Sequence, residues 1–193
     1  MNDRPAVVVL AAGKGSRFEG ARHKLEQPFG SSTVLGSTLA NAIASGLPVV
    51  VVTTEALADE AARTVAKRDV VVVSDFEASR GMGHSIAAGV AASADAGGWL
   101  VLPGDMPRVS ANTLRTVANT LEDHSVVYAQ HLGRRGHPVG FSTELFSELL
   151  SLAGDEGARR LLARYPAFGV DVDDPGTLMD IDTVADLHAA RSA

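Results

Sequence analysis

Small and positively charged residues follow the first apolar segment of the chain, in an arrangement that suits a polyphosphate. The segment 7–10 is branched and apolar without alternation, which is typical of a strand buried on both faces. Gly13 and Gly15 follow it, and Arg17 and Lys24 add positive charge. Freed backbone N–H groups and fixed cations are what a polyphosphate needs. The sequence therefore predicts a nucleoside triphosphate site at the carboxyl end of the first strand.

The loop departs from two common phosphate-binding templates. Gly15 and Gly20 have the spacing of a P-loop, but Ala-Arg follows where Lys-Ser/Thr is required. The dinucleotide fingerprint fits at Gly13 and Gly15, but Phe18 replaces the third glycine. That glycine lets a helix pack closely on the strand, and phenylalanine cannot replace it.

Asp105 is a candidate ligand for a divalent cation. It follows the apolar segment 99–102 and a Pro-Gly pair, which places it just beyond the end of a predicted strand. A carboxylate there can hold Mg²⁺, a hard cation that prefers oxygen ligands and substrate phosphates. A turn aspartate is the structural alternative. The phosphate loop on a neighbouring strand favours the metal-binding interpretation.

Two other segments carry residues whose types suit substrate contacts. Gly81 and Gly83 let the backbone approach a flat base, and Ser85 can hydrogen-bond the edge of that base. Taken alone, an ordinary glycine-rich helix start explains these residues better. Pro138 restricts His137 to extended geometry, so the imidazole can face a pocket, although a structural role fits equally well.

Strand-like and helix-like segments alternate along the chain. The predicted strands span residues 6–12, 47–53, 70–73, 99–102, 126–130, 138–142 and 167–172. The predicted helices span residues 31–44, 55–67, 83–94, 110–121, 144–152, 156–164 and 183–191, with Ser110 as an N-cap. We therefore expect one α/β domain over residues 1–193, a three-layer α/β/α fold with a mostly parallel, Rossmann-like sheet. Ligands in such sheets bind beyond the carboxyl ends of the strands. The acidic cluster at 171–174 is expected to be solvated.

The composition limits the classes of function. With 193 residues and 46% hydrophobic content, the chain can bury one full core. A net charge of −6, the lack of a basic tail and 5% aromatic residues argue against nucleic-acid binding. No membrane span, signal peptide or cysteine is recognised, so we expect a cytoplasmic protein without membrane contacts. No zinc-binding cluster or Gly-x-Ser-x-Gly elbow is present in the sequence.

The run Leu-Ala-Ala-Gly-x-Gly-Ser-Arg-Phe at 10–18, with a lysine downstream, resembles the nucleotidyltransferases that activate sugars, alditols and cofactors. Within that superfamily the chain is most similar to the molybdenum cofactor cytidylyltransferases and their relatives, over nearly its whole length. In this family the loop wraps the triphosphate, and a Gly-Met-x-x-Ser motif touches the cytosine. The nucleotide-binding residues that the resemblance implies are Leu10, Ala11, Ala12, Gly13, Gly15, Ser16, Arg17, Lys24, Gly81 and Ser85.

The loop departs from the family pattern in its length. Family members usually have glycine directly after Arg-Phe and lysine five residues after the arginine. Here Glu19 intervenes, and Lys24 is seven residues after Arg17. The loop is longer by two, so Arg22 is an alternative to Lys24 as the phosphate-binding cation.

The resemblance also implies a metal site. The family's Asp-x-Pro matches residues 105–107, with Asp105 as a metal ligand. The family's Asp-Ile-Asp-Thr-x-x-Asp-Leu matches residues 180–187, which makes Asp182 the second ligand. A helix cap formed by Asp182 or Thr183 is the structural alternative.

Two further motifs resemble the part of the family that surrounds the acceptor. The family's Gly-x-x-Gly-His/Asn-Pro-Val matches residues 133–139 and implies His137 and Arg135 as acceptor-binding residues. The family's Gly-Asp-x-Gly-Ala-Arg matches residues 154–159, where Asp155 as a helix cap requires no function.

The implied reaction is transfer of a nucleoside monophosphate from a nucleoside triphosphate to a phosphorylated small molecule, with release of pyrophosphate. The implied catalytic residues are Arg17, Lys24, Asp105 and Asp182, with Mg²⁺ as cofactor. The Ala-Ala pair at 11–12 favours CTP, because relatives that use GTP usually have Ala-Gly there. The likeness points to molybdopterin as the acceptor and to a molybdoenzyme or its chaperone as a partner.

Three alternatives stay open. The first is a transferase of the same superfamily that uses GTP or a sugar or alditol phosphate. The second is an oxidoreductase, against which the broken dinucleotide fingerprint weighs. The third is a non-catalytic nucleotide-binding module, against which the presence of both Asp105 and Asp182 weighs.

Overall fold

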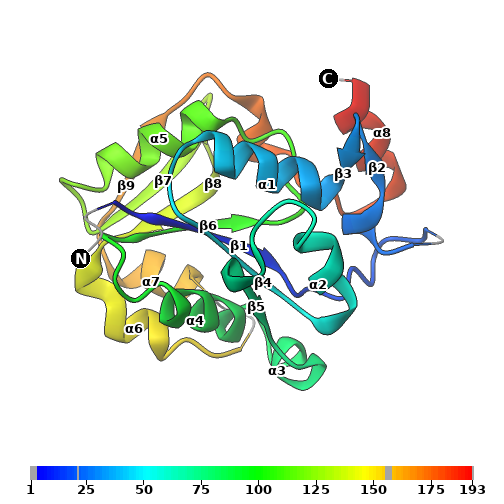
Figure 1. Ribbon diagram of the computed structural model, residues 1–193. Helices are drawn as coiled ribbons and strands as arrows, with labels where there is room; N and C mark the ends of the chain where they lie inside the picture. Colours follow the sequence, from blue (N-terminus) through cyan, green and yellow to red (C-terminus); the bar gives the residue numbers. More distant parts are fainter. Residues whose placement is uncertain (1–3, 21, 155–157, 193) are drawn as a thin grey trace.

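A seven-stranded, mostly parallel sheet forms the centre of the computed structural model, which describes residues 4–20, 22–154 and 158–192 (Figure 1). The strand order is β5-β4-β1-β6-β8-β7-β9, and β8 alone runs antiparallel to its neighbours in this sheet. The sheet strands are β1 (Ala6–Ala11), β4 (Val49–Thr53), β5 (Val70–Val72), β6 (Trp99–Pro103), β7 (Val126–His131), β8 (Arg134–Phe141) and β9 (Ala167–Asp171). The predicted α/β fold class is confirmed.

Helices cover both faces of the sheet, which gives the three layers expected from the sequence (Figure 1). One face carries α1 (Val34–Ala44), α2 (Glu55–Ala61), α5 (Ala111–Thr120) and α8 (Val184–Ser192). The other face carries α4 (Met82–Ala92), α6 (Phe146–Leu150) and α7 (Arg159–Arg164). The remaining short elements are α3 (Asp75–Ser79), the hairpin β2 (Pro28–Phe29) and β3 (Ser32–Thr33), and the 3₁₀ turns η1 (Lys24–Glu26), η2 (Lys67–Asp69), η3 (Thr143–Leu145) and η4 (Pro175–Leu178).

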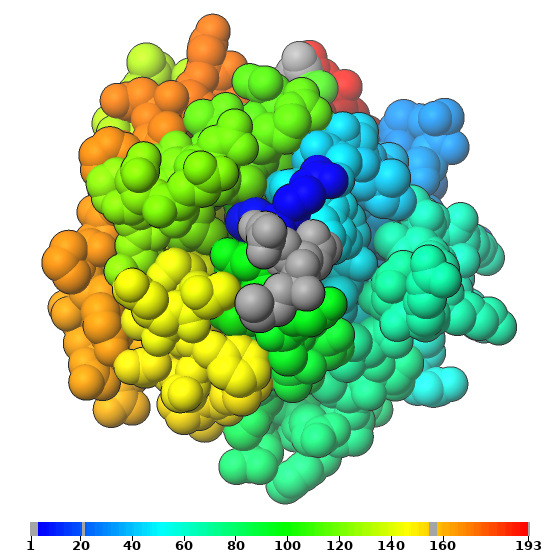
Figure 2. Space-filling model, turned by 60° about the vertical axis from the view of Figure 1, so that its left-hand side comes forward, coloured from blue at the N-terminus to red at the C-terminus, as the bar shows by residue number. Residues whose placement is uncertain are grey.

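The central strand β1 is buried on both faces, as its uninterrupted apolar run predicts. It pairs with β4 on one side and β6 on the other, and all three run in the same direction. Figure 2 views the side where the first described residues enter the molecule, shown in dark blue beside α1 in cyan. The loops that follow β1 and β6 therefore lie together at the opposite, carboxyl ends of these strands.

β5 lies at the edge of the sheet and is more exposed than the sequence predicts. The sequence predicts a short buried strand at 70–73, but Val70 and Val71 are half-buried and Val72 is 47% exposed. This prediction is wrong because β5 pairs only with β4 and lies at the edge of the sheet. An apolar run does not reveal whether a strand will have one neighbour or two.

Several helix boundaries in the structure differ from the predicted ones, and a capping group explains the start of α1. Thr33 accepts a hydrogen bond from the Gly36 N–H, so α1 begins at Val34 rather than at 31. Ser110 caps α5 as predicted, by accepting a hydrogen bond from the Thr113 N–H. The helix predicted at 144–152 is a 3₁₀ turn followed by α6. Asp155, a predicted cap, lies outside the described residues.

Asp174 is buried, which corrects the prediction of a solvated acidic turn. Its carboxylate accepts hydrogen bonds from the Ser110 N–H at 2.9 Å, the Thr113 hydroxyl at 2.6 Å and the Gly176 N–H at 3.0 Å. These bonds tie α5 to η4, and so they fix the segment that leads to Asp182. Sequence spacing does not reveal this role, because the partners Ser110 and Thr113 are about 60 residues away.

Every helix within the described ranges is too short or too polar to span a bilayer.

Candidate active site

A cavity of about 730 Å³ lies at the carboxyl ends of β1 and β6. It is lined by the loop that follows β1, the start of α4, the end of β6, the β8 segment around His137, and the segment that precedes α8. All of the predicted catalytic, nucleotide-binding, acceptor-binding and metal-binding residues line this cavity except Ala11. The structure therefore gathers in one place residues that lie up to 172 positions apart, from Leu10 to Asp182.

Ala11 is the exception because side chains alternate along a strand. Leu10 and Ala12 line the cavity, whereas Ala11 is 1% exposed and packs in the core with Val9 and Val51. The Ala11 side chain therefore does not line the cavity, and its role in nucleotide binding stays a prediction.

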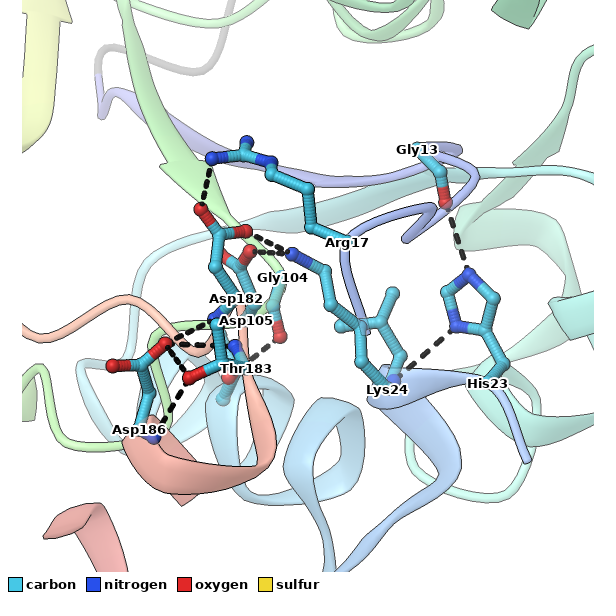
Figure 3. A network of polar contacts seen from close by, with 11 residues as sticks. Gly13, Arg17, His23, Lys24, Gly104, Asp105, Asp182, Thr183 and Asp186 are labelled. Carbon is cyan, nitrogen blue, oxygen red and sulfur yellow. Dashed lines mark hydrogen bonds and ion pairs between the residues drawn. The ribbon is translucent and has the colours of Figure 1, made fainter. Parts of the chain in front are cut away.

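His23 closes the loop that follows β1. Its Nε2 lies 3.0 Å from the carbonyl oxygen of Gly13, and its Nδ1 accepts a hydrogen bond from the Leu25 N–H at 3.2 Å (Figure 3). Gly15 adopts a φ of +60°, which favours glycine at this turn. His23 thus ties the start of the loop to η1, where Lys24 begins. Sequence analysis missed this residue, and its position beside Lys24 is the only signal for it.

Asp105 is placed by a close approach between two strand ends. The Gly104 N–H donates to the Leu10 carbonyl oxygen at 2.8 Å, and a Cβ added to Gly104 would lie 2.9 Å from that oxygen. The Asp105 carbonyl oxygen in turn accepts a hydrogen bond from the Ile181 N–H at 3.0 Å. This backbone bond brings the segment before α8, and with it Asp182, beside Asp105.

The Asp182 carboxylate does not cap α8 and faces the loop that follows β1. Thr183 accepts a hydrogen bond from the Asp186 N–H, and the Asp186 carboxylate accepts from the N–H groups of Asp182 and Thr183 (Figure 3). Of the two predicted capping residues, Thr183 therefore caps the start of α8.

Lys24 joins the two acidic residues. Its Nζ lies 2.6 Å from Oδ2 of Asp105 and 2.9 Å from Oδ1 of Asp182 (Figure 3). An Arg17 guanidinium nitrogen lies 2.8 Å from Oδ2 of Asp182. The Lys24 side chain is 11% exposed, whereas that of Arg17 is 77% exposed. The structure thus brings the four predicted catalytic residues into one contiguous network.

Lys24 is charged at neutral pH. Burial by itself lowers the pKa of this ammonium, but the Asp105 charge and hydrogen bonds to Asp105 and Asp182 oppose it, and the net pKa lies above 10.5. Arg22, the alternative cation, is exposed and does not line the cavity. The geometry therefore favours Lys24 over Arg22 as the cation that faces a ligand here.

The two carboxylates suit a hard divalent cation such as Mg²⁺. Oδ1 of Asp105 is buried and has no hydrogen-bond partner within the part of the chain that the structure describes. The described residues contain no cluster of three or more His, Cys, Asp or Glu side chains that could hold a metal. A Mg²⁺ ion at this place would therefore take its remaining ligands from water and substrate phosphates, which is how this ion is usually held.

Basic residues from β8 and from the start of α7 line another side of the cavity, namely Arg134, Arg135, His137 and Arg159. The acidic Asp180 also lines the cavity, and its charge acts on His137. The Arg135 guanidinium lies 4.2 Å from the centroid of the Tyr128 ring. Burial lowers the pKa of His137 although the Asp105 charge opposes this, so the imidazole is neutral at pH 7. Sequence analysis missed Arg159, although it ends the matched motif at 154–159.

The start of α4 forms a third wall of the cavity. Gly81 adopts a φ of +107° and Ser85 is buried, and both line the cavity. Gly83 has a packing role, because a Cβ there would lie 2.8 Å from the backbone nitrogen of Ala153. The glycines of this motif therefore serve two different purposes, one facing the cavity and one facing the neighbouring chain segment.

The chain belongs to the family of MobA-like NTP transferase domains, whose family model matches residues 7–168. It is 34% identical to the purine catabolism protein PucB of Bacillus subtilis strain 168, covering 96% of this chain and 95% of that protein. It is 30% identical to the nicotine blue oxidoreductase of Paenarthrobacter nicotinovorans, covering 96% of this chain and 97% of that protein. The molybdenum cofactor cytidylyltransferase of Escherichia coli strain K12 is 22% identical, covering 95% of this chain and 94% of that protein.

Among solved structures, the chain is similar to Rv0371c from Mycobacterium tuberculosis H37Rv. The TM-score is 0.85 and the sequence identity 31%, covering 98% of this chain and 99% of that one. Another structure of Rv0371c is a complex with manganese, and it matches with a TM-score of 0.80. The predicted membership of the nucleotidyltransferase superfamily is confirmed.

Proposed function

We propose that this protein transfers CMP from CTP to a phosphorylated small molecule, of which molybdopterin is the first candidate, and releases pyrophosphate. The observation that carries this proposal is the network in which Arg17 and Lys24 of the phosphate loop meet Asp105 and Asp182. Two cations and two carboxylates thus lie together in the cavity at the carboxyl ends of β1 and β6, where ligands of such sheets bind, and this supports the proposal.

The reaction requires positioning and charge neutralisation rather than a dedicated base. A phosphate oxygen of the acceptor attacks the α-phosphorus of CTP, a new phosphorus–oxygen bond forms, and the bond to the bridging oxygen of pyrophosphate breaks. Arg17 and Lys24 hold the triphosphate and balance the charge of the leaving pyrophosphate. Asp105 and Asp182 would hold Mg²⁺, whose chemistry is to polarise phosphoryl oxygens. Arg135 and His137, which line the same cavity, orient the acceptor.

The choice of CTP rests on the loop and on one relative. Ala12 lines the cavity, and the Ala-Ala pair at 11–12 differs from the Ala-Gly that the resemblance associates with GTP-using relatives. A cytidylyltransferase is among the proteins that match almost the whole chain. Gly81 and Ser85 form the wall against which the base would lie.

A pyrophosphate-release assay with each of the four nucleoside triphosphates, Mg²⁺ and molybdopterin tests the proposal. We expect release with CTP to exceed that with the other three and to require the acceptor. Faster release with GTP would reassign the base, and failure with every triphosphate and with sugar and alditol phosphates would contradict the transferase itself.

The similarity to an oxidoreductase favours one other candidate function. Phe18 stands where a dinucleotide-binding loop needs its third glycine, and it packs partly buried against the core. We expect no change of NAD(P)H fluorescence when the protein is added. Saturable quenching at micromolar protein would support the oxidoreductase over the transferase.

A further inference from the structure

The Lys24 ammonium lies between the carboxylates of Asp105 and Asp182. Its Nζ contacts one oxygen of Asp105 and one of Asp182, the two carboxylates to which the proposed function assigns Mg²⁺ (Figure 3). An ion such as Mg²⁺ requires its oxygen ligands at about 2.0–2.1 Å in near-octahedral geometry. A metal ion bound through these same two oxygens would therefore displace the ammonium.

The network is also electrically balanced before any ligand arrives. The carboxylates of Asp105 and Asp182 carry two negative charges, and Lys24 and Arg17 carry two positive charges. Lys24 is only 11% exposed, so water screens its two ion pairs poorly. A free divalent cation that approaches this network meets no net charge and competes with an ammonium already bound.

We propose that Lys24 is a displaceable counter-ion that makes metal binding depend on the nucleotide, an inference that rests on the proposed function. The phosphates of an incoming triphosphate offer Lys24 and Arg17 new anionic partners inside the same cavity. When these side chains turn to the phosphates, both carboxylates become available to the metal ion, which the phosphates also bind. The protein thus holds the metal ion weakly alone and tightly with the nucleotide.

The size of the effect follows from coupling between two ligands. Couplings between sites in proteins typically change an affinity about 5- to 150-fold, and the change is reciprocal. Removing the Lys24 charge should therefore tighten the binding of a metal ion to the nucleotide-free protein by about tenfold or more. It should also abolish most of the further tightening that the nucleotide brings to the wild type.

Lys14 provides a matched control. It lines the same cavity on the same loop, and no ion pair of Lys14 is found among the described residues. Lys14→Met changes the charge of the cavity as much as Lys24→Met does, but it leaves the ammonium between the carboxylates in place. The comparison separates a local displacement from the general effect of one positive charge fewer.

The experiment titrates Mn²⁺ alone into the nucleotide-free protein and follows the free ion by electron paramagnetic resonance. We expect Lys24→Met to bind Mn²⁺ at least tenfold more tightly than the wild type, with Lys14→Met and Lys24→Arg within about threefold of the wild type. Circular dichroism checks that each variant is folded. Equal affinity in wild type and Lys24→Met, or equal tightening in Lys24→Met and Lys14→Met, would overturn the inference.

A further variant separates this inference from the proposed function. In the Lys24→Met background, Asp105→Asn should remove the tight Mn²⁺ binding. If Lys24→Met binds no more tightly than the wild type but both lose Mn²⁺ on Asp105→Asn, the metal site stands and the counter-ion role fails. If Asp105→Asn leaves Mn²⁺ binding unchanged, the carboxylate metal site of the proposed function fails, and the counter-ion role fails with it.

Discussion

Two regions of the cavity are built differently. In the region formed by the β1 loop, every cation of the central network is paired with a carboxylate, through Lys24, Arg17, Asp105 and Asp182. In the region formed by β8 and the start of α7, Arg135 stacks on an aromatic ring, and none of the described arginines that line it forms an ion pair within the described chain. The residues of the first region are ordered by ion pairs before ligands bind, whereas the arginines of the second have no carboxylate partner among the described residues.

In the proposed reaction, the two groups of residues therefore bind different substrates. The proposed function assigns the triphosphate and the metal ion to the paired groups, so changes there should affect turnover with any acceptor. The second region has the character of a surface for an anionic acceptor, so changes there should affect the acceptor alone. The following predictions test that division.

Asp105→Asn should have the largest effect. It removes the carboxylate that faces Lys24 and would hold the metal ion, a contribution of several kcal/mol, so kcat should fall about 10³-fold or more. The measurement is pyrophosphate release with CTP and acceptor. Asp173→Asn, an exposed acid outside the cavity, is the control and should retain wild-type turnover. Undiminished activity of Asp105→Asn would remove the assignment.

Lys24→Ala should lower kcat/KM for the triphosphate by about 10²–10³-fold, because removing one pre-organised charge donor from a transition state typically costs that much. Arg17→Ala should cost less, since its side chain is 77% exposed and water screens it. Arg22→Ala should stay near wild type. A larger loss for Arg22→Ala than for Lys24→Ala, measured in the same steady-state assay, would show that the longer loop shifts the register of the phosphate-binding cation.

Arg135→Ala should raise KM for the acceptor about tenfold and leave KM for the triphosphate unchanged. A hydrogen bond to a charged group contributes about 1.5–3 kcal/mol, and leaving the Tyr128 ring costs Arg135 about 0.5–1 kcal/mol. The net amount corresponds to roughly a factor of ten. An equal rise of both KM values would mean that the two regions of the cavity do not act separately.

His137→Gln should change the acid stability by a small amount. Burial lowers the pKa of His137 below 6.5, so the unfolded chain binds a proton that the folded chain does not. Below about pH 6.5 the free energy of unfolding of the wild type should therefore fall relative to that of the variant, by at most about 1.4 kcal/mol per pH unit. Urea unfolding between pH 7.5 and 5.5 measures the difference, and parallel curves would contradict the buried neutral imidazole.

The sequence is sufficient for the fold class and for most of the cavity lining. The apolar run of β1 and the position of Asp105 after β6 place both at the same edge of the sheet, and the structure confirms that proximity. Sequence reasoning does not identify β8 as antiparallel. Its two-residue connection to β7, with positive φ at Leu132 and Gly133, is a hairpin turn too short for a crossover.

What the sequence cannot supply is the pairing between distant side chains. The bond from Lys24 to Asp182 joins residues 158 positions apart, and the bonds from Asp174 to α5 span about 60 positions. Both depend on the packing of η4 and α8 against the strand ends rather than on any local pattern. The same is true of His23, whose contact with Gly13 appears only when the loop is folded.

Binding of Mn²⁺ together with CTP tests the central claim most directly. Pulsed electron paramagnetic resonance should detect phosphorus coupling to Mn²⁺ bound by the wild type in the presence of CTP. Asp105→Asn and Asp182→Asn should each weaken that binding at least tenfold, since each carboxylate is one of the two that the protein supplies. If both variants bind Mn²⁺ with CTP as tightly as the wild type does, the two carboxylates do not form the metal site and the account is wrong.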